Sequence, residues 1–318
     1  MADARDSKSR LARGEGSSPS SGTMETPFVI AVVGPTASGK SALGVYLAKK
    51  LRGEIISADS RQVYKELTIG TGKITPKEME GVTHHLLDVI SPKRRFTVSE
   101  YVKKGTPILH AIHARKHIPI IVGGTGLYAD ALLGRISFPE VPPNPSLRAR
   151  LEKKSTAALY ALLKKKDPRR AKTIETDHKR RLIRALEIAY AIGKTPPPSK
   201  KQTYKILWLG VHVGENMLRK KIHDRLLKRV QEGMISEARR LHVKGLSYKR
   251  MTELGLEYAY LALLLQKKLS RERFMEELER AIVKYTKRQM RWFKRNQEIM
   301  WVKNKSEALT KAKQFLSV

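Results

Sequence analysis

The sequence predicts an α/β fold, in which a parallel sheet is flanked by helices and carries a mostly helical insertion domain. Three observations lead to this prediction. Residues 28–138 alternate short apolar runs with helical stretches, as expected for parallel strands joined by helices. Residues 34–41 read Gly-Pro-Thr-Ala-Ser-Gly-Lys-Ser, a phosphate-binding pattern placed between a strand and a helix. Residues 139–199 begin with four closely spaced prolines and continue as basic helices, which is typical of an insertion.

Short apolar runs place the strands in chain order. Each run is followed by glycine, polar residues or a helical pattern, as buried strands of an α/β sheet usually are. The helix after the phosphate-binding loop is expected at 41–48. The expected strands are 28–33, 54–57, 86–89, 118–122 and 206–211.

Changes in composition divide the chain into four parts. The first residues are polar, rich in serine, glycine and arginine, and without periodicity, so we expect disorder there. The last part returns to a strand pattern and is then mostly helical. The predicted parts are a disordered tail at 1–26, a P-loop NTPase-like α/β core at 27–138, a basic helical insertion at 139–199 and a mostly helical completion of the core at 200–318.

The charge of the chain indicates a polyanionic partner. The formal net charge is +34, from 64 lysine and arginine residues against 30 aspartate and glutamate residues. A field of this sign attracts polyanions and speeds their encounter, although a lysine-rich surface can also serve solubility alone. Residues 147–205 hold 18 basic and only five acidic residues. This concentration in the insertion favours an RNA backbone as the partner.

Composition also excludes several classes of protein. The chain has no cysteine, which removes disulfides, thiolate chemistry and cysteine-ligated zinc. No apolar run reaches the length that crosses a bilayer, and the N-terminus lacks the hydrophobic segment of a secretory signal. We therefore expect a cytoplasmic protein with no membrane contact.

The glycine-rich loop is expected to bind a phosphate or diphosphate. In such a loop, backbone N–H groups and the helix N-terminus surround phosphate oxygens. The Lys40 ammonium neutralises their charge, and the Ser41 hydroxyl can ligate Mg²⁺. The expected diphosphate-binding residues are Gly34, Pro35, Thr36, Ala37, Ser38, Gly39, Lys40 and Ser41.

Two more loops follow predicted strands and are expected at the same edge of the sheet. Ligands of open α/β sheets bind beyond the carboxyl ends of the strands, where residues 59–62 and 123–126 both lie. Asp59 is then either a metal-shell group or a general base; capping the next helix is its alternative role. Thr125 supplies a hydroxyl between glycines that permit close backbone approach. The pair His84-His85 is expected to be structural, or at most to support a site residue, because neighbouring strand residues point to opposite faces.

A C-terminal helix is expected to carry a basic stripe. Its cations recur at three- and four-residue steps, which places them on one helical face, with apolar residues largely on another. A solvated surface is the alternative, but together with the basic insertion an RNA-facing stripe is favoured. The residues are Lys284, Lys287, Arg288, Arg291, Lys294 and Arg295.

Taken together, the motifs resemble those of the tRNA dimethylallyltransferases, also called tRNA isopentenyltransferases, of the bacterial type without a zinc finger. The resemblance covers about residues 28–300. Two positions depart from the family pattern: Gly72, where alanine is usual, and Thr83, where proline is usual. The matching segments are 34–41, 57–64, 70–73, 84–88, 122–128, 180–187, 193–195, 253–258 and 288–293.

The resemblance implies transfer of the dimethylallyl group of dimethylallyl diphosphate to N6 of the adenosine on the 3′ side of the tRNA anticodon, with pyrophosphate as the leaving group. It implies that Asp59 is the general base, that Thr125 lies at the reacting centre, and that Lys40 and a Mg²⁺ ion on Ser41 stabilise the pyrophosphate. It also implies a monomer whose insertion binds tRNA. The implied tRNA-binding residues are Asp59, Ser60, Arg61, Gln62, Thr125, Arg148, Arg180, Arg181, Arg184, Arg288, Gln289 and Arg291.

Three other functions remain open on the sequence. A P-loop kinase would use Asp59 to deprotonate an acceptor hydroxyl and would consume ATP. A prenyltransferase acting on free adenine nucleotides would show no preference for tRNA over AMP and no strong salt dependence. The third is a non-catalytic RNA-binding protein, which would be ruled out if an Asp59→Ala change abolished turnover and left tRNA binding intact.

Overall fold

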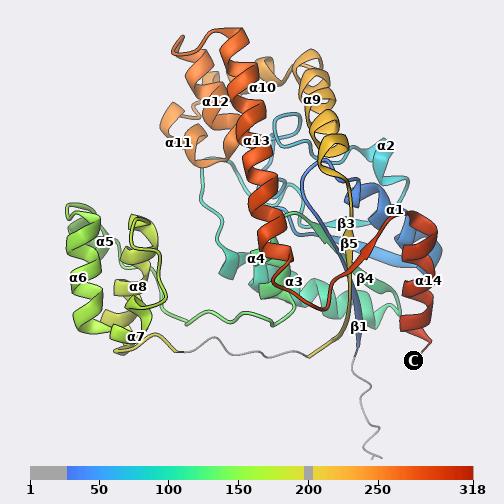
Figure 1. The fold of residues 1–318 in the computed structure, drawn as a ribbon, viewed down its shortest axis with the longest axis horizontal. Coiled ribbons are helices and arrows are strands. Elements are labelled where there is room, and N and C mark those ends of the chain that lie inside the picture. Colours follow the sequence, from blue (N-terminus) through green and yellow to red (C-terminus); the bar gives the residue numbers. More distant parts are fainter. Residues whose placement is uncertain (1–26, 197–202, 318) are drawn as a thin grey trace, which may run out of the picture.

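One parallel sheet forms the centre of the part of the chain that the computed structural model describes, residues 27–196 and 203–317. Its strand order is β3-β2-β4-β1-β5-β6 (Figure 1). All strand pairs are parallel, so the carboxyl ends of the strands share one edge. The strands are β1 (Phe28–Val33), β2 (Gly53–Ser57), β3 (His84–His85), β4 (Ile118–Gly123), β5 (Lys205–Val211) and β6 (Met300–Val302).

The predicted fold class is confirmed, and one predicted strand is wrong. The apolar runs at 28–33, 54–57, 118–122 and 206–211 form β1, β2, β4 and β5. The strand expected at 86–89 lies instead at His84–His85. Leu86 and Asp88 have φ values of 62° and 54°, a left-handed conformation that an extended strand does not contain. The predicted tail at 1–26 lies outside the described residues.

Helices cover both faces of the sheet. Val29, Ala31 and Val33 of β1 share a core with α3 and α4, whereas Ile30 and Val32 pack against α1 and α14. A parallel strand covered on both faces is apolar throughout, which explains the unbroken apolar run of β1. The helices that flank the sheet are α1 (Lys40–Leu51), α3 (Val98–Ala114), α4 (Gly126–Leu132) and α14 (Lys305–Leu316). The short helix α2 (Pro76–Met79) lies in the segment between β2 and β3 and buries none of its residues.

A second helical layer lies above the carboxyl edge of the sheet (Figure 1). Its core joins residues 63–67, which follow β2, to apolar side chains from five helices. The longest of these helices, α13, places Phe274 and Leu278 in this core and Phe293 in the core of the sheet. The helices are α9 (Glu215–Gln231), α10 (Met234–Val243), α11 (Tyr248–Glu253), α12 (Leu256–Leu265) and α13 (Arg271–Phe293).

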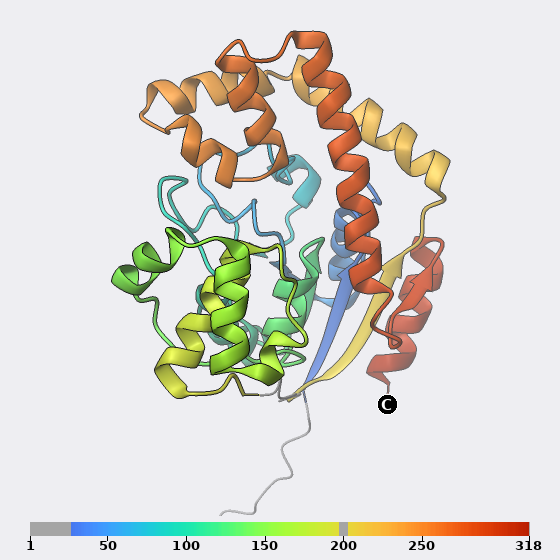
Figure 2. The same cartoon turned by 60° about the vertical axis from the view of Figure 1, so that its left-hand side comes forward.

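The last four of the five described helices between β4 and β5 form a separate lobe, which we call the helical lobe (Figures 1 and 2). They bury their own apolar cluster, which includes Leu151, Leu163 and Leu186. Prolines of the entering segment and Asn144, which caps the first helix, mark where the lobe begins. The exact boundaries at 139 and 199 stay a prediction. The lobe helices are α5 (Pro145–Glu152), α6 (Thr156–Lys166), α7 (Pro168–Ala171) and α8 (Lys179–Ile192).

A buried carboxylate holds the helical lobe together. The side chain of Glu187 on α8 is 1% exposed and accepts hydrogen bonds from Arg148 at 2.9 and 2.8 Å. It also binds Arg184 and accepts the Asn144 N–H at 2.6 Å, which fixes the start of α5. Burial opposes ionisation, but these donors hold the pKa of Glu187 below its usual range. The carboxylate is therefore charged and stabilises the lobe at neutral pH.

We expect Glu187→Gln to destabilise the helical lobe by about 1–3 kcal/mol, because the change leaves partly buried donors without a charged acceptor. Hydrogen exchange of α5 and α8 should accelerate, whereas exchange in β1 and β4 should not change, since the two cores are separate. Glu152→Gln is the matched control, because that carboxylate is 54% exposed. Equal exchange in wild type and Glu187→Gln would contradict the prediction.

Candidate active site

The phosphate-binding loop has the shape that its sequence predicts. Gly39 and Ala37 have positive φ values of 92° and 61°, so the loop turns sharply before α1 begins at Lys40. The hydroxyl of Ser38 is buried and has no hydrogen-bond partner among the described residues. A buried hydroxyl without a partner is costly, and a bound phosphate oxygen would satisfy it. The loop therefore suits an anionic ligand at the N-terminus of α1.

Two cations meet at this loop. Lys40 is a half-buried residue, and its ammonium donates to the Pro35 carbonyl at 3.1 Å. Loss of water around it lowers the pKa of Lys40 to about 8; the Asp59 carboxylate opposes this shift and the Arg225 guanidinium adds to it. Burial and the nearby Arg229 also lower the pKa of Arg225. Partly desolvated cations held close together are stabilised by an anion placed between them.

A cavity of about 770 Å³ opens at the start of α1. Gly39, Lys40, Ser41 and Arg225 line it, so the loop and both cations face the same space. The outer wall is also basic, and it includes Lys49, Lys50, Lys221 and Lys305. Six cations against two carboxylates in the lining favour a ligand with more than one negative charge.

Arg225 is a site residue that the sequence analysis missed. It lies on α9 and donates to the Gly72 carbonyl at 2.9 Å, which fixes it over the segment after β2. The signal was present in the sequence: Arg225 and Arg229 are four residues apart and flank the buried Leu226, so they continue the buried face of α9.

Asp59 follows β2 and turns the chain at the edge of the site. Its Oδ1 accepts the N–H of Arg61 at 2.8 Å and the N–H of Gln62 at 3.4 Å. The capping role that was the alternative therefore exists, although it caps a turn rather than a helix. Only Oδ1 is used in these bonds, so Oδ2 can take part in chemistry.

The loop after β4 is held against the loop after β2. The Thr125 N–H donates to the Ala58 carbonyl at 3.0 Å, and the Thr125 hydroxyl oxygen accepts the Ser60 N–H at 3.1 Å. A side chain at Gly123 would place its Cβ 2.1 Å from the Ala58 carbonyl oxygen, so only glycine permits this approach. The predicted convergence of Asp59, Ser60 and Thr125 is thus present in the structure.

Gln289 ties the third loop to the phosphate-binding loop. Its Oε1 accepts the Thr36 N–H at 2.9 Å, and its Nε2 donates to the Gly124 carbonyl at 2.8 Å. The residue is 7% exposed, and it reaches the site from α13. Gln289 therefore joins two of the three strand-end loops, and the contacts of Thr125 join the third loop to them.

The residues expected to bind tRNA lie in different environments. The guanidinium groups of Arg148 and Arg184 bind Glu187 inside the helical lobe, so charge reversal at Arg184 would disturb the lobe itself. Gln289 already bonds at both ends of its amide. Contact of these residues with RNA stays a prediction. Four further residues of the set are exposed: Arg180, Arg181, Arg288 and Arg291.

The histidine pair has the structural role that we expected. His85 Nε2 lies 2.7 Å from Glu54 Oε2, and Arg115 and His117 bind the same carboxylate. His84 Nδ1 lies 2.8 Å from the Val82 carbonyl. No group of three possible metal ligands occurs among the residues that the structure describes. Within the same ranges, no helix is both long and apolar enough to cross a membrane.

Comparison with known proteins gives the family of the chain. A model of IPP transferases matches residues 62–296, and a model of isopentenyl transferases matches residues 27–95. The chain belongs to the IPP transferase family. The resemblance seen in its motifs is thereby confirmed.

Relatives and solved structures of this family cover nearly the whole chain. The tRNA dimethylallyltransferase of Carboxydothermus hydrogenoformans is 37% identical over 294 residues, 89% of this chain and 94% of that protein. The tRNA dimethylallyltransferase 1 of Hahella chejuensis is 40% identical over 84% of this chain and 87% of its own. The tRNA isopentenylpyrophosphate transferase of Bacillus halodurans, a crystal structure, has a TM-score of 0.69 at 33% identity, covering 92% of this chain and 96% of that one. A eukaryotic dimethylallyltransferase acting on tRNA has a TM-score of 0.73 at 27% identity, covering 84% of this chain and 69% of that one.

Proposed function

We propose that this protein transfers the dimethylallyl group of dimethylallyl diphosphate to N6 of the adenosine on the 3′ side of a tRNA anticodon. One observation carries the proposal: Lys40 and Arg225 line one cavity at the start of α1. Hydrogen bonds through Gln289 and Thr125 tie the loop that holds Asp59 to the same place. An anion-binding centre and a carboxylate thus occupy one edge of the sheet. The relatives that bear the name tRNA dimethylallyltransferase support the same reaction.

At the donor side, the diphosphate binds between the loop and α9. Backbone N–H groups at the start of α1, the Ser38 hydroxyl, Lys40 and Arg225 surround its oxygens. Negative charge grows on the diphosphate as its bond to C1 of the dimethylallyl group breaks, so these groups stabilise the transition state more than the ground state. Mg²⁺ fits the exposed Ser41 hydroxyl together with diphosphate oxygens, because Mg²⁺ takes few protein ligands. When bound, it would add positive charge at the leaving group.

At the acceptor side, Asp59 receives the proton. The adenine N6 forms a bond to C1 of the donor, the C1–oxygen bond breaks, and pyrophosphate leaves with the electron pair. The proton that N6 loses passes to the Asp59 carboxylate. The hydrogen bonds from Arg61 and Gln62 fix that carboxylate, and the Thr125–Ser60 contact fixes the loop opposite.

The high positive charge of the protein supports an RNA as the acceptor. An adenine must leave its stack to reach Asp59, which costs a few kcal/mol. Phosphate contacts to basic residues of the helical lobe and of α13 offset this cost. We also propose that the protein acts as a monomer in the cytoplasm.

The direct test incubates the protein with Mg²⁺, dimethylallyl diphosphate and an unmodified tRNA transcript that carries adenosine next to the anticodon. We expect N6-isopentenyladenosine in the digested tRNA by mass spectrometry, without added ATP. AMP in place of tRNA is the control for the acceptor. Absence of product together with ATP hydrolysis would overturn the proposal in favour of a kinase.

The pH profile gives a second test of the donor site. Lys40 is charged below its pKa of about 8 and neutral above it. Because the diphosphate needs the charged form, kcat/KM for dimethylallyl diphosphate should fall as pH rises through about 8. Lys40→Arg keeps a charge at these pH values, so its profile should stay flat there. If kcat/KM of the Lys40→Arg variant fell over the same pH range, the group that titrates would not be Lys40.

A further inference from the structure

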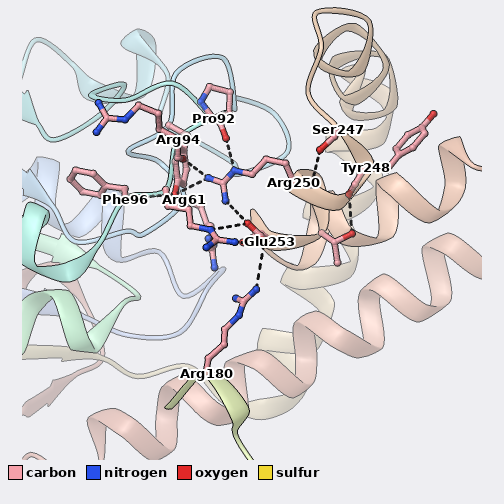
Figure 3. A network of polar contacts seen from close by, with 12 residues as sticks. Arg61, Pro92, Arg94, Phe96, Arg180, Ser247, Tyr248, Arg250 and Glu253 are labelled. Atoms are coloured by element: carbon pink, nitrogen blue, oxygen red, sulfur yellow. Dashed lines mark hydrogen bonds and ion pairs between the residues drawn. The ribbon is translucent and has the colours of Figure 1, made fainter. Parts of the chain in front are cut away.

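A single ion pair joins the helical lobe to the rest of the chain among the described residues. Arg180 on α8 reaches Glu253 at the end of α11, with 3.4 Å between Nη2 and Oε1 (Figure 3). The lobe has its own apolar core and shares no buried cluster with the sheet or the upper helices. Glu253 therefore lies where the lobe meets the core.

Three guanidinium groups converge on the Glu253 carboxylate. Arg95 makes two bonds to it, 2.6 and 3.2 Å long, and Arg250 makes one of 3.1 Å. These bonds, led by those from Arg95, hold the pKa of Glu253 below its usual range. A fourth arginine, Arg61, approaches the backbone carbonyl of Glu253 at 3.4 Å. One carboxylate cannot neutralise three guanidinium charges, so the cluster stays positive.

The arginines of this cluster differ in how firmly the protein holds them. Arg250 is 13% exposed, and it also donates to the carbonyls of Pro92 and Arg94 (Figure 3). By contrast, the side chains of Arg95 and Arg180 are 69% and 77% exposed, and among the described residues Glu253 is the one acidic partner of each. Arg250 is thus part of the scaffold, whereas Arg95 and Arg180 are cations that an external anion can reach.

We propose that Arg95 and Arg180 bind a backbone phosphate of the substrate RNA, and that the Glu253 carboxylate occupies this site when RNA is absent. The proposal rests on the proposed function, which supplies the RNA. It assigns Glu253 the role of a competitor that holds both arginines in place.

A phosphate can replace the Glu253 carboxylate without leaving any of these charged groups unpaired. Arginine forks bind carboxylate and phosphate oxygens with the same geometry, so a phosphodiester can take over the bonds that Glu253 accepts. The Arg180–Glu253 contact is long and the Arg180 side chain is exposed, so its loss costs little stability. Glu253 keeps its bond to Arg250 after the exchange and is not left as an unpaired charge. The phosphate also joins the lobe to the core through one bound group.

The test is a set of tRNA dissociation constants measured against salt concentration for wild type and variants. The double change of Arg95 and Arg180 to Gln should weaken binding and reduce the slope of log K against log salt by roughly 0.7–0.9, as expected for one lost phosphate contact. Each single change should have a smaller effect of the same kind. Glu253→Gln should tighten binding roughly two- to fivefold. In the background of both arginine changes, Glu253→Gln should have no effect, because the groups it competes for are absent.

General charge effects and misfolding are separated by controls. Glu152→Gln removes an exposed carboxylate of the same lobe whose partner, Lys179, is not among the residues expected to bind tRNA, so it reports the effect of charge alone. The melting temperature of every variant is compared with wild type; Arg180 is too exposed for its change to unfold the protein. Equal tightening by Glu253→Gln and Glu152→Gln, or tightening that persists without Arg95 and Arg180, would overturn the proposal.

Wild-type activity keeps the two proposals distinct. If wild type modifies tRNA but the arginine variants bind it with unchanged affinity and salt slope, only the phosphate site is overturned. If wild type neither binds nor modifies tRNA, both proposals fail.

Discussion

Asp59→Asn is expected to lower turnover roughly 10²–10⁴-fold, the usual loss when a general base is removed. Asparagine keeps an oxygen at Oδ1, so it can still accept the N–H groups of Arg61 and Gln62 that shape the loop. It cannot accept the proton of the attacking nitrogen. The affinity for tRNA should therefore stay close to wild type while the chemical step fails.

Single-turnover prenylation of tRNA and a separate tRNA-binding titration measure the two effects. Asp59→Ala removes both the base and the turn contacts, so it should lose the same turnover and, in addition, some thermal stability. Asp224→Asn, which changes a 55% exposed carboxylate on α9, is the matched control. Wild-type turnover in Asp59→Asn would show that another group takes the proton.

Lys40→Met should reduce kcat/KM for the donor roughly 10²–10³-fold, the effect of removing one preorganised charge from an anionic transition state. The same change should leave the fold intact or raise the melting temperature. The reason is the lowered pKa: desolvation and the Arg225 guanidinium make a charged Lys40 unfavourable in the ligand-free protein. Lys40→Met is thus expected to lower kcat/KM while it leaves the melting temperature unchanged or raises it.

Initial rates at varied donor concentration, together with a thermal melt, test this prediction. Lys50→Met is the control, because Lys50 lines the outer wall of the same cavity and is exposed. If Lys40→Met had the wild-type kcat/KM for the donor, the Lys40 ammonium would have no part in the mechanism. Equal losses in both variants would indicate a general effect of cavity charge.

Local sequence patterns were sufficient to predict most of the fold and the loops at the centre of the candidate site. The loop at 34–41, the apolar run of β1 and the polar residues after β2 and β4 are contiguous in sequence, so their conformations follow from neighbouring residues. Parallel strands then bring those loops to one edge. The short strand at His84–His85 escaped prediction, because two residues carry no periodicity and the apolar residues after them turn instead.

The amino-acid sequence was enough to predict an α/β core with a glycine-rich loop and a basic helical insertion. Which polar side chains lie at the candidate site and which hold the fold together became visible in the three-dimensional structure alone. Gln289 joins loops 165 and 253 residues away, Glu187 takes up Arg148 and Arg184, and Glu253 gathers arginines from three parts of the chain. An arginine that binds RNA and one that binds a buried carboxylate look the same in a sequence. Their partners differ because folding sets distances between residues that are far apart along the chain.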